Sequence, residues 1–175
     1  MSGPVELQIG DWALREWRES DIPSLVHYAN NRNVWINLRD RFPHPYTKAD
    51  GEAWIALRAK DVAQTQFAIV NSEEAIRGIG VELQIDDERR SAEIGYWLAE
   101  PFWNLGIMTR AARAVTEYAF AEFDLARIYS TVIDWNPASA RVLEKAGYSF
   151  EGRLRRSVTK DGKLADRLLY AIVRE

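Results

Sequence analysis

Apolar and polar residues alternate with a period of two in several parts of the chain, a pattern typical of β-strands that bury one face. This alternation predicts strands within residues 5–14 and in "TQFAIV", "IRGIGVELQI", "AEIGYWL" and "RIYSTVI". The nearly continuous apolar run "LLYAIV" predicts a buried strand close to the C-terminus. In "IRGIGVELQI" the alternation places four residues on one face of the strand: Ile79, Val81, Leu83 and Ile85.

Apolar residues spaced three and four apart predict two helices in the N-terminal half. The first is "SDIPSLVHYANN", in which Ser20 or Asp21 would be the N-cap and a proline lies in the first turn. The second is "TKADGEAWIALRAK", which begins with Thr47 and Asp50 at the spacing of a capping box. Gly51 follows directly and is expected to cost helix stability.

Two more helices are predicted in the C-terminal half. The first covers residues 109–123, with Ala112, Val115 and Ala119 as its buried stripe. The second is "NPASARVLEKAGY", which has Asn136 as N-cap, proline at the first helical position and Gly147 as the stop signal. This order of elements predicts an α+β fold with a mixed central sheet and helices on both faces, not a regular doubly wound one. No linker or repeat interrupts the 175 residues, so a single domain over residues 1–175 is expected.

Composition narrows the range of functions. The chain has no cysteine, which excludes disulfides and a thiolate nucleophile and fits a cytoplasmic protein. His27 and His44 lack metal-ligand spacing, so no metal is expected. The net charge of −3 gives no general reason to expect nucleic acid, and Arg153, Arg155 and Arg156 are expected to form a solvated strand face. No signal peptide and no apolar run of the roughly 18–20 residues that span a bilayer is evident, so no membrane partner is expected.

The stretch "EIGYWLAEPFWNLGIMTRAARA" joins a predicted strand to a predicted helix through a loop with one glycine. The free N–H groups at the start of a helix, together with the helix dipole, make a physical site for an anion. Gly106 would let a phosphate approach the backbone without a Cβ in the way. The loop has an ordinary alternative, because every strand-to-helix turn presents such groups to water or to a cap. Neither GxGxxG nor GxxxxGK[ST] is present, and the missing P-loop lysine argues against phosphoryl transfer.

A second segment decides between these alternatives. Together, "EIGYWLAEPFWNLGIMTRAARAVTEYAF" and "NPASARVLEKAGYSFEGRLR" resemble the GNAT-type N-acetyltransferases, which take acetyl-CoA as acetyl donor. The resemblance is strongest to the branch that contains the RimJ/RimL-type acetyltransferases of ribosomal-protein N-termini and the spermidine acetyltransferases. "LREWRESDIPSL" and "PYTKADGEAWI" resemble the N-terminal half of that branch. The family's loop pattern, R/Q-x-x-G-x-G/A, is matched at Gly106, while Trp103 and Met108 depart from its strictest form.

The resemblance implies how acetyl-CoA would bind as co-substrate. Backbone N–H groups of the loop would hold the pyrophosphate, and the end of the preceding strand would pair with the pantetheine amides like an added strand. The Leu98 N–H would then be an oxyanion donor to the thioester carbonyl. The implied coenzyme-binding residues are Tyr96, Trp97, Leu98, Trp103, Asn104, Leu105, Gly106, Ile107, Met108, Thr109, Asn136, Ser139 and Arg141.

The implied chemistry is acyl transfer from sulfur to nitrogen, and the absence of cysteine favours direct transfer to the amine. Glu93 stands where some relatives carry a catalytic glutamate and is the expected proton acceptor, with a structural salt bridge as the equally weighted alternative. Many relatives have a tyrosine seven residues after Asn136, where this chain has Leu143. Ser139 stands where the ribosomal-protein branch has a serine that can serve the thiolate, so the resemblance makes it the expected proton donor, although a thiolate of pKa near ~8.5 can also leave unassisted.

The acceptor is expected to be a primary amine. A lysine side chain with pKa ~10.4 is almost wholly protonated at neutral pH, whereas an N-terminal α-amine near ~7.7–8.0 is partly neutral, so a protein N-terminus is favoured over a lysine side chain. A polyamine or other small amine stays open as the alternative, and Leu143 in the usual tyrosine position counts against a spermidine-type enzyme. Trp35, Tyr46 and Trp54 fall in the segment that overhangs the acceptor site in this family; they are expected in the core, with one or two free to line a substrate cleft. A non-catalytic acyl-CoA-binding or sensor domain on the same fold is the alternative from another class. Assembly into a homo-oligomer is left open.

Overall fold

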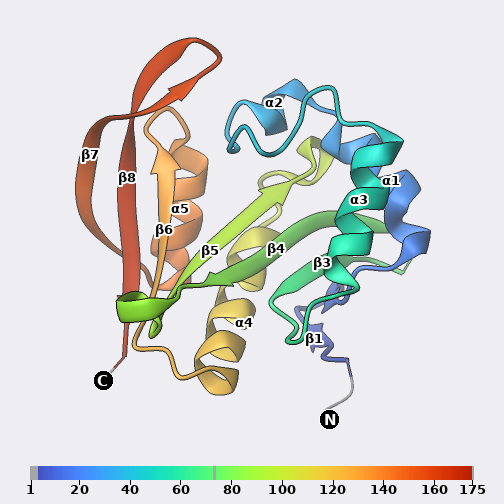
Figure 1. Cartoon of the computed structure of the whole chain (residues 1–175), viewed down its shortest axis with the longest axis horizontal. Helices are drawn as coiled ribbons and strands as arrows, with labels where there is room; N and C mark the ends of the chain where they lie inside the picture. The colour runs from blue at the N-terminus through green and yellow to red at the C-terminus, as the bar shows by residue number, and fades with distance from the viewer. Residues whose placement is uncertain (1–3, 73, 175) are drawn as a thin grey trace. The chain divides into compact units, whose positions relative to one another are not determined.

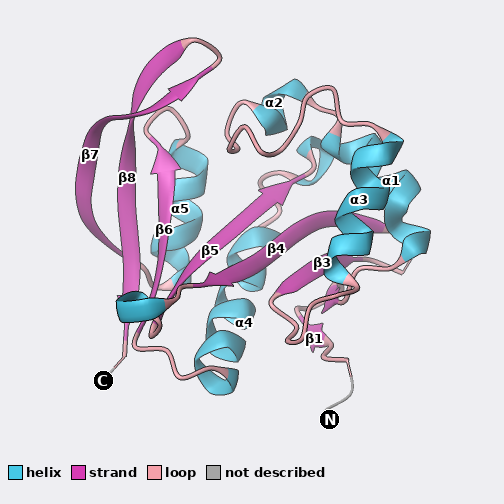
Figure 2. Cartoon of the chain, viewed as in Figure 1, coloured by secondary structure: helices cyan, strands magenta, loops and turns pink. Residues whose placement is uncertain are grey.

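The computed structural model describes residues 4–72 and 74–174 and combines strands and helices (Figure 1, Figure 2). In chain order the strands are β1 (Leu7–Gln8), β2 (Ala13–Arg15), β3 (Gln66–Val70), β4 (Ala75–Leu83), β5 (Ser91–Leu98), β6 (Arg127–Ile133), β7 (Ser149–Lys160) and β8 (Lys163–Val173). The α-helices are α1 (Ile22–Ala29), α2 (Arg32–Trp35), α3 (Lys48–Arg58), α4 (Ile107–Glu122) and α5 (Pro137–Ala146). The 3-10 turns are η1 (Glu19–Asp21), η2 (Asp86–Glu88) and η3 (Glu100–Phe102). Across the described ranges, no helix combines the length and the apolar character that crossing a membrane requires.

The described residues form two compact units. Unit 1 contains the chain up to Gly80 together with Tyr96–Ile107, and unit 2 contains Val81–Gly95 together with the chain from Met108 onward. Strands β4 and β5 each begin in one unit and end in the other. The end of β5 and the loop after it therefore belong to unit 1, whereas most of α4 and all of α5 belong to unit 2.

Unit 1 contains an antiparallel run of strands in the order β1-β2-β3-β4. Leu14 of β2 lies opposite Ile69 of β3, and Phe67 lies opposite Ile79 of β4. All four of these side chains are at most 1% exposed, as the alternation in the sequence predicts. Of the four residues predicted to share one face of β4, Ile79 and Val81 are buried, whereas Leu83 is 37% exposed. Ile85 lies beyond the end of β4 and is 82% exposed, so its assignment to that face is wrong.

Helices α1 and α3 of unit 1 approach each other at Gly51. A Cβ on Gly51 would lie 3.2 Å from Cγ2 of Val26 and 3.5 Å from Cγ2 of Ile22. The glycine that costs helix propensity is therefore buried against α1, where a side chain would force the two helices apart. The predicted capping box of α3 is confirmed, since Thr47 Oγ1 accepts from the Asp50 N–H and Asp50 Oδ2 accepts from the Thr47 N–H.

Asp21 precedes α1 but does not cap it with its side chain. The carboxylate instead accepts two hydrogen bonds from the Arg15 guanidinium, at 2.7 and 2.8 Å, and one from the Arg18 N–H at 2.9 Å. Asp21 is 3% exposed, and sequence spacing alone could not reveal its partner on β2. The pair raises the pKa of Arg15, chiefly through the hydrogen bonds to Asp21.

Unit 2 contains strands in the order β5-β6-β8-β7, in which β5 runs parallel to β6 and the other neighbours are antiparallel. This mixture of directions confirms the predicted mixed sheet. Strand β8 contains the predicted apolar run, and strand β7 contains the predicted arginine-bearing strand; the two form a long hairpin (Figure 1, red). Its pairing register shifts between Phe150 and Gly152 and again between Leu154 and Val158.

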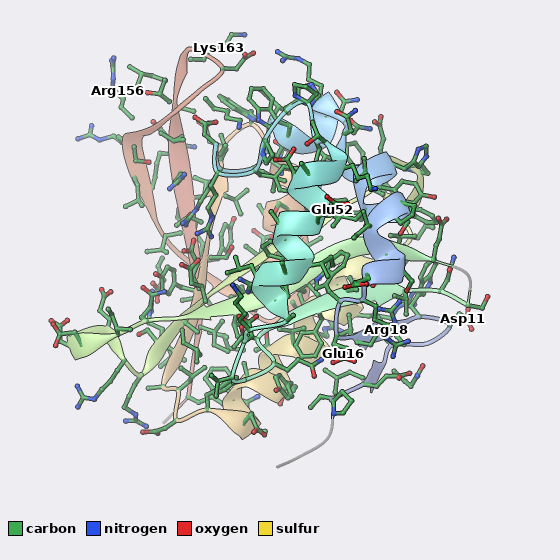
Figure 3. All side chains as sticks on the ribbon, turned by 45° about the vertical axis from the view of Figure 1, so that its right-hand side comes forward. Asp11, Glu16, Arg18, Glu52, Arg156 and Lys163 are labelled. Carbon is green, nitrogen blue, oxygen red and sulfur yellow. The ribbon has the colours of Figure 1, made fainter. Side chains whose placement is uncertain are left out.

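The three arginines of β7 are exposed, as expected for a solvated face. Arg156 has a φ of 51° and lies within the second register shift, so the strict alternation assumed for the three residues does not hold there. Figure 3 shows the side chains of Arg156 and Lys163 extending outward from the far part of the hairpin.

Helix α4 begins two residues earlier than predicted, and its predicted stripe is confirmed because Ala112, Val115 and Ala119 are fully buried. The ends of α5 are as predicted: Asn136 Oδ1 accepts from the Ser139 N–H at 3.2 Å, and Gly147 adopts the left-handed conformation with φ of 102°. The short helix α2 was not predicted, because one turn carries too little periodic signal.

Replacing Asp21 with alanine should lower the free energy of unfolding by about 3 kcal/mol, because the Arg15 guanidinium, whose side chain is 14% exposed, loses its counter-charge. Urea unfolding at constant m-value measures the change. Asp124→Ala is the matched control, since Asp124 pairs with Arg90 through side chains that are 84% and 57% exposed, and it should leave the midpoint almost unchanged. Equal losses in the two variants would contradict a stabilising role for the buried pair.

Candidate functional site

The end of β5 and the turn after it carry the first group of predicted site residues. Leu98 is the last residue of β5, and its carbonyl accepts a hydrogen bond of 2.8 Å from the Trp103 indole N–H. Trp103 occupies the position where the loop pattern has arginine or glutamine. Its only polar side-chain atom thus binds protein backbone, so Trp103 closes the η3 turn and offers no side-chain donor to a phosphate.

The loop before α4 has the backbone of an anion cradle. Asn104 and Gly106 both adopt positive φ angles, 63° and 69°, and both are exposed. A Cβ built on Gly106 would meet no atom within 4 Å, so the space beside the loop is open. Leu105, which lies between Asn104 and Gly106, is 56% exposed. The loop therefore has room for a phosphate beside its backbone, at the start of a helix.

Ile107 and Met108 begin α4 with side chains that are 2% and 3% exposed. These side chains pack into the protein, so only the backbone N–H groups of the two residues remain for a ligand. Thr109 follows as a half-buried residue in the same turn. The departure of Met108 from the strict loop pattern consequently changes the packing of α4 and leaves the backbone donors in place.

Trp97 contributes to the hydrophobic core of unit 1. Its indole nitrogen lies 2.8 Å from the position of a Cβ on Gly78 of β4, and its rings lie 5.8 Å from the Phe42 ring. Gly78 is thus the residue that makes room for the indole, and only the backbone of Trp97 remains for a pantetheine arm. Tyr96 and Leu98 on either side are half-buried.

Glu93 lies on the part of β5 that belongs to unit 2. It is half-buried and stands opposite Tyr129, at the end of the parallel β5–β6 ladder. Both strands continue past this pair, to Leu98 and Ile133. The Glu93 residue interacts with other groups of the protein, as a structural residue would. Its partial exposure is also compatible with a catalytic role.

Asn136, Ser139 and Arg141 come together at the start of α5. The Asn136 side chain caps the helix through the Ser139 N–H, as described above, while Arg141 is exposed. Leu143, which replaces the tyrosine of many relatives, is fully buried and contributes to the core. The nearby Tyr148 does not replace that tyrosine, because its hydroxyl is hydrogen-bonded to Thr116 Oγ1 at 2.6 Å. Burial raises the pKa of Tyr148 to about 12.

An ion-pair cluster that the sequence did not indicate supports the segment before α5. Arg153 of β7 contacts Asp134 at 3.2 Å and Asp166 of β8 at 2.7 Å, and Asp166 also accepts from the Arg156 N–H at 2.7 Å. These contacts lower the pKa of Asp166, chiefly through the Arg156 N–H and then through Arg153. Asp134 lies two residues before Asn136, so the hairpin holds the turn that leads to the α5 cap.

The three aromatic residues expected in the core or beside a substrate cleft, Trp35, Tyr46 and Trp54, differ in their surroundings. Tyr46 is 6% exposed and belongs to the core of unit 1, and Trp54 packs against that core. Trp35 stacks on His44 with ring centroids 5.5 Å apart. His44 and His27 are both exposed. Within residues 4–72 and 74–174, no group of three or more histidine, aspartate or glutamate side chains comes together in a way that could hold a metal ion.

Comparison with known proteins identifies the family. The model of the acetyltransferase (GNAT) domain matches residues 12–149. The chain therefore belongs to the GNAT family of acetyltransferases, and it is an N-acetyltransferase by family. The predicted resemblance and fold class are confirmed by this match and by the solved structures described next.

Three relatives illustrate the range of the family. An uncharacterized N-acetyltransferase of Bacillus subtilis, YnaD, is 28% identical over 93% of each chain. The structure of Mycobacterium smegmatis RimJ in complex with CoA-disulfide is 27% identical, with a TM-score of 0.81 over 98% of this chain and 86% of that one. The spermidine N-acetyltransferase of Vibrio cholerae, in complex with CoA and spermine, is 23% identical, with a TM-score of 0.78 over 93% and 95%.

Substituting Gly106 with glutamate should abolish thermal stabilisation by acetyl-CoA, because a side chain and a negative charge would enter the open space beside the loop. Melting temperatures with and without acetyl-CoA measure the effect. Gly162→Glu provides the control, since Gly162 also has a positive φ, 73°, and open surroundings, but lies in the β7–β8 turn. Gly162→Glu should keep the full shift. An undiminished shift in Gly106→Glu would refute a phosphate-binding loop at this position.

Proposed function

We propose that the protein transfers the acetyl group of acetyl-CoA directly to a primary amine, with a protein N-terminal α-amine as the favoured acceptor. The observation that carries the proposal is the exposed loop with positive φ at Asn104 and Gly106, placed between the end of β5 and the start of α4 in a GNAT acetyltransferase. The complexes of RimJ with CoA-disulfide and of spermidine acetyltransferase with CoA support the same class of ligand.

Acetyl-CoA would supply the thioester that donates the acetyl group. The loop backbone from Asn104 to Thr109 would bind its pyrophosphate, and the Leu98 N–H would donate to the thioester carbonyl. The Leu98 carbonyl is already bound to the Trp103 indole, which fixes the peptide unit that follows Leu98 and the turn beyond it. A fixed turn at this point would hold the strand end ready for the pantetheine amides.

Two side chains would handle protons. Glu93 would accept the proton that the amine loses on attack, directly or through water. Ser139, at the first turn of α5, would donate a proton to the departing thiolate, or water would do so in its place. Leu143 is buried and carries no proton donor, and the buried Tyr148 hydroxyl is hydrogen-bonded to Thr116. Both observations support the choice of Ser139 over a tyrosine.

The charges of the acceptor segment favour an N-terminus over a polyamine. Residues 31–46 carry three arginines, Arg32, Arg39 and Arg41, and one acidic residue, Asp40, all exposed. A polyamine carries several positive charges, and the excess of arginine, which is reduced but not cancelled by the Glu100 carboxylate bound to Asn31 and Asn33, would repel it. An N-terminal α-amine brings a single charge, and that charge is partly lost at neutral pH because the α-amine pKa is about 7.7–8.0.

Turnover of acetyl-CoA against a panel of amines tests the proposal. The panel contains short peptides with free N-termini, the same peptides blocked at the N-terminus but carrying lysine, and spermidine. Transfer to free N-termini with little transfer to blocked peptides is expected. A preference for spermidine would show that the acceptor is a polyamine and not a protein N-terminus. Absence of transfer to every amine would favour a non-catalytic acyl-CoA-binding role.

Glu93→Gln should lower kcat/KM by roughly 10²–10⁴-fold at neutral pH while leaving acetyl-CoA binding intact, because glutamine cannot accept the proton. The deficit should shrink as the pH rises, since the amine then loses its proton without help. pH–rate profiles of both enzymes provide the measurement.

Ser139→Ala serves as the comparison for Glu93→Gln. Its deficit should be smaller, because a thiolate is a tolerable leaving group, and it should not follow the titration of the amine. Wild-type rates for Glu93→Gln at every pH would leave Glu93 with a structural role only.

A further inference from the structure

Glu100, two residues beyond the end of β5, binds the segment that begins α2. Asn31 Nδ2 donates to its Oε2 at 2.8 Å, and Asn33 Nδ2 donates to Oε1 and Oε2 at 3.2 and 3.1 Å. These two amides lower the pKa of the Glu100 carboxyl, Asn31 more than Asn33. All three residues belong to unit 1. The hydrogen bonds are assisted by the carboxylate charge and are therefore stronger than bonds between neutral groups.

The Asn31 side chain uses both ends of its amide. Its Oδ1 accepts from the Asn33 N–H at 2.8 Å and so caps α2, while its Nδ2 donates to Glu100. Helix α2 has only four residues, and a single turn does not hold its shape alone. The orientation of α2 consequently depends on the burial of Val34 and on the hydrogen bonds to Glu100.

A second contact joins the same segment to β5. The Phe42 ring, which follows α2, lies 5.8 Å from the Trp97 rings and 5.0 Å from the Tyr46 ring. Residues 31–46 thus contact the chain both before and after Leu98. They pack against Trp97 and donate hydrogen bonds to Glu100. Leu98 supplies the proposed donor to the thioester, so this segment borders the position where the acetyl group would be transferred.

We propose that Glu100 is a positioning residue that holds α2 beside the end of β5, so that the acceptor amine is aligned with the thioester. The inference rests on the proposed function, because it takes the Leu98 end of β5 as the place of transfer. Glu100 makes no contact with the reacting atoms in this arrangement and acts through Asn31 and Asn33. Misplacement of a substrate-binding segment by about 1 Å can lower a rate by about 10²-fold, so a positioning role has a measurable consequence.

An exchange of chemical groups between Glu100 and Asn31 tests the proposal. Glu100→Ala removes the acceptor completely, and Asn31→Asp places a second carboxylate against Glu100 while it keeps the cap on the Asn33 N–H. The double variant Asn31→Asp/Glu100→Gln reverses the donor and the acceptor, so the contact can form again without the repulsion. Glu52→Ala is the control, because Glu52 is an exposed glutamate of α3 in the same unit (Figure 3) that pairs only with Lys48 among the described contacts.

Glu100→Ala and Asn31→Asp should each raise the acceptor KM or lower kcat so that kcat/KM for the acceptor falls about 10-fold, while the Kd of acetyl-CoA measured by calorimetry changes less than about twofold. The double variant should recover most of the loss of Asn31→Asp, because the hydrogen bond between positions 31 and 100 can form again. Hydrogen–deuterium exchange of residues 31–46 should rise in both single variants and fall again in the double variant. Glu52→Ala should behave as the wild type.

Failure of this inference is distinguishable from failure of the proposed function. A wild-type protein without transfer to any amine refutes the proposed function, whatever the variants do. An active wild type whose Glu100→Ala variant keeps its acceptor kcat/KM refutes only the positioning role. Loss of acetyl-CoA affinity in parallel with acceptor kcat/KM, or no recovery in the double variant, would likewise show that Glu100 does not act by holding α2.

Discussion

The backbone of β5 is the constraint on which the candidate site depends, because a single strand supplies residues to both compact units. Its parallel ladder with β6 ends at Glu93, and the strand then continues to Leu98. In the proposed function, an amide-containing ligand would bind to this last part of the strand as an added strand does. The Trp103 indole and the Glu100 carboxylate then fix the chain immediately after the strand. The backbone groups proposed to bind the ligand, and the side chains that fix the chain beside them, therefore lie within a few residues of the end of β5.

The site relies on backbone more than on side chains. The side chains of Trp97, Ile107 and Met108 pack into the protein. The indole N–H of Trp103 donates to the Leu98 carbonyl and is therefore not available to a ligand. A loop of this kind tolerates departures from the strict family pattern, because a phosphate on N–H groups does not depend on side-chain identity. In the proposed function, specificity for the acceptor would come from side chains outside this loop, and we expect the exposed arginines of residues 31–46 to contribute to it.

Sequence reasoning succeeded where the determinants are local and failed where they are distant. The caps of α3 and α5 and the left-handed Gly147 follow from neighbours three or four residues away, and all are as predicted. The buried partner of Asp21 and the role of Gly51 depend on elements that only the fold brings together, so no spacing rule could find them. The contribution of Glu100 was missed for the same reason, since Asn31 lies 69 residues away. The coenzyme contacts and the proton-transfer roles stay predictions.

The two register shifts in β7 have a consequence for how the protein behaves at high concentration. β7 is the outermost strand of the run β5-β6-β8-β7, and an outer strand with a regular backbone invites pairing with another molecule. The shifts after Phe150 and Leu154 interrupt that regularity, and the exposed Arg155 and Arg156, which lie within the second shift, would repel the same residues of an approaching copy. The edge is thereby a poor template for an intermolecular sheet, so concentrated samples should resist aggregation along this strand.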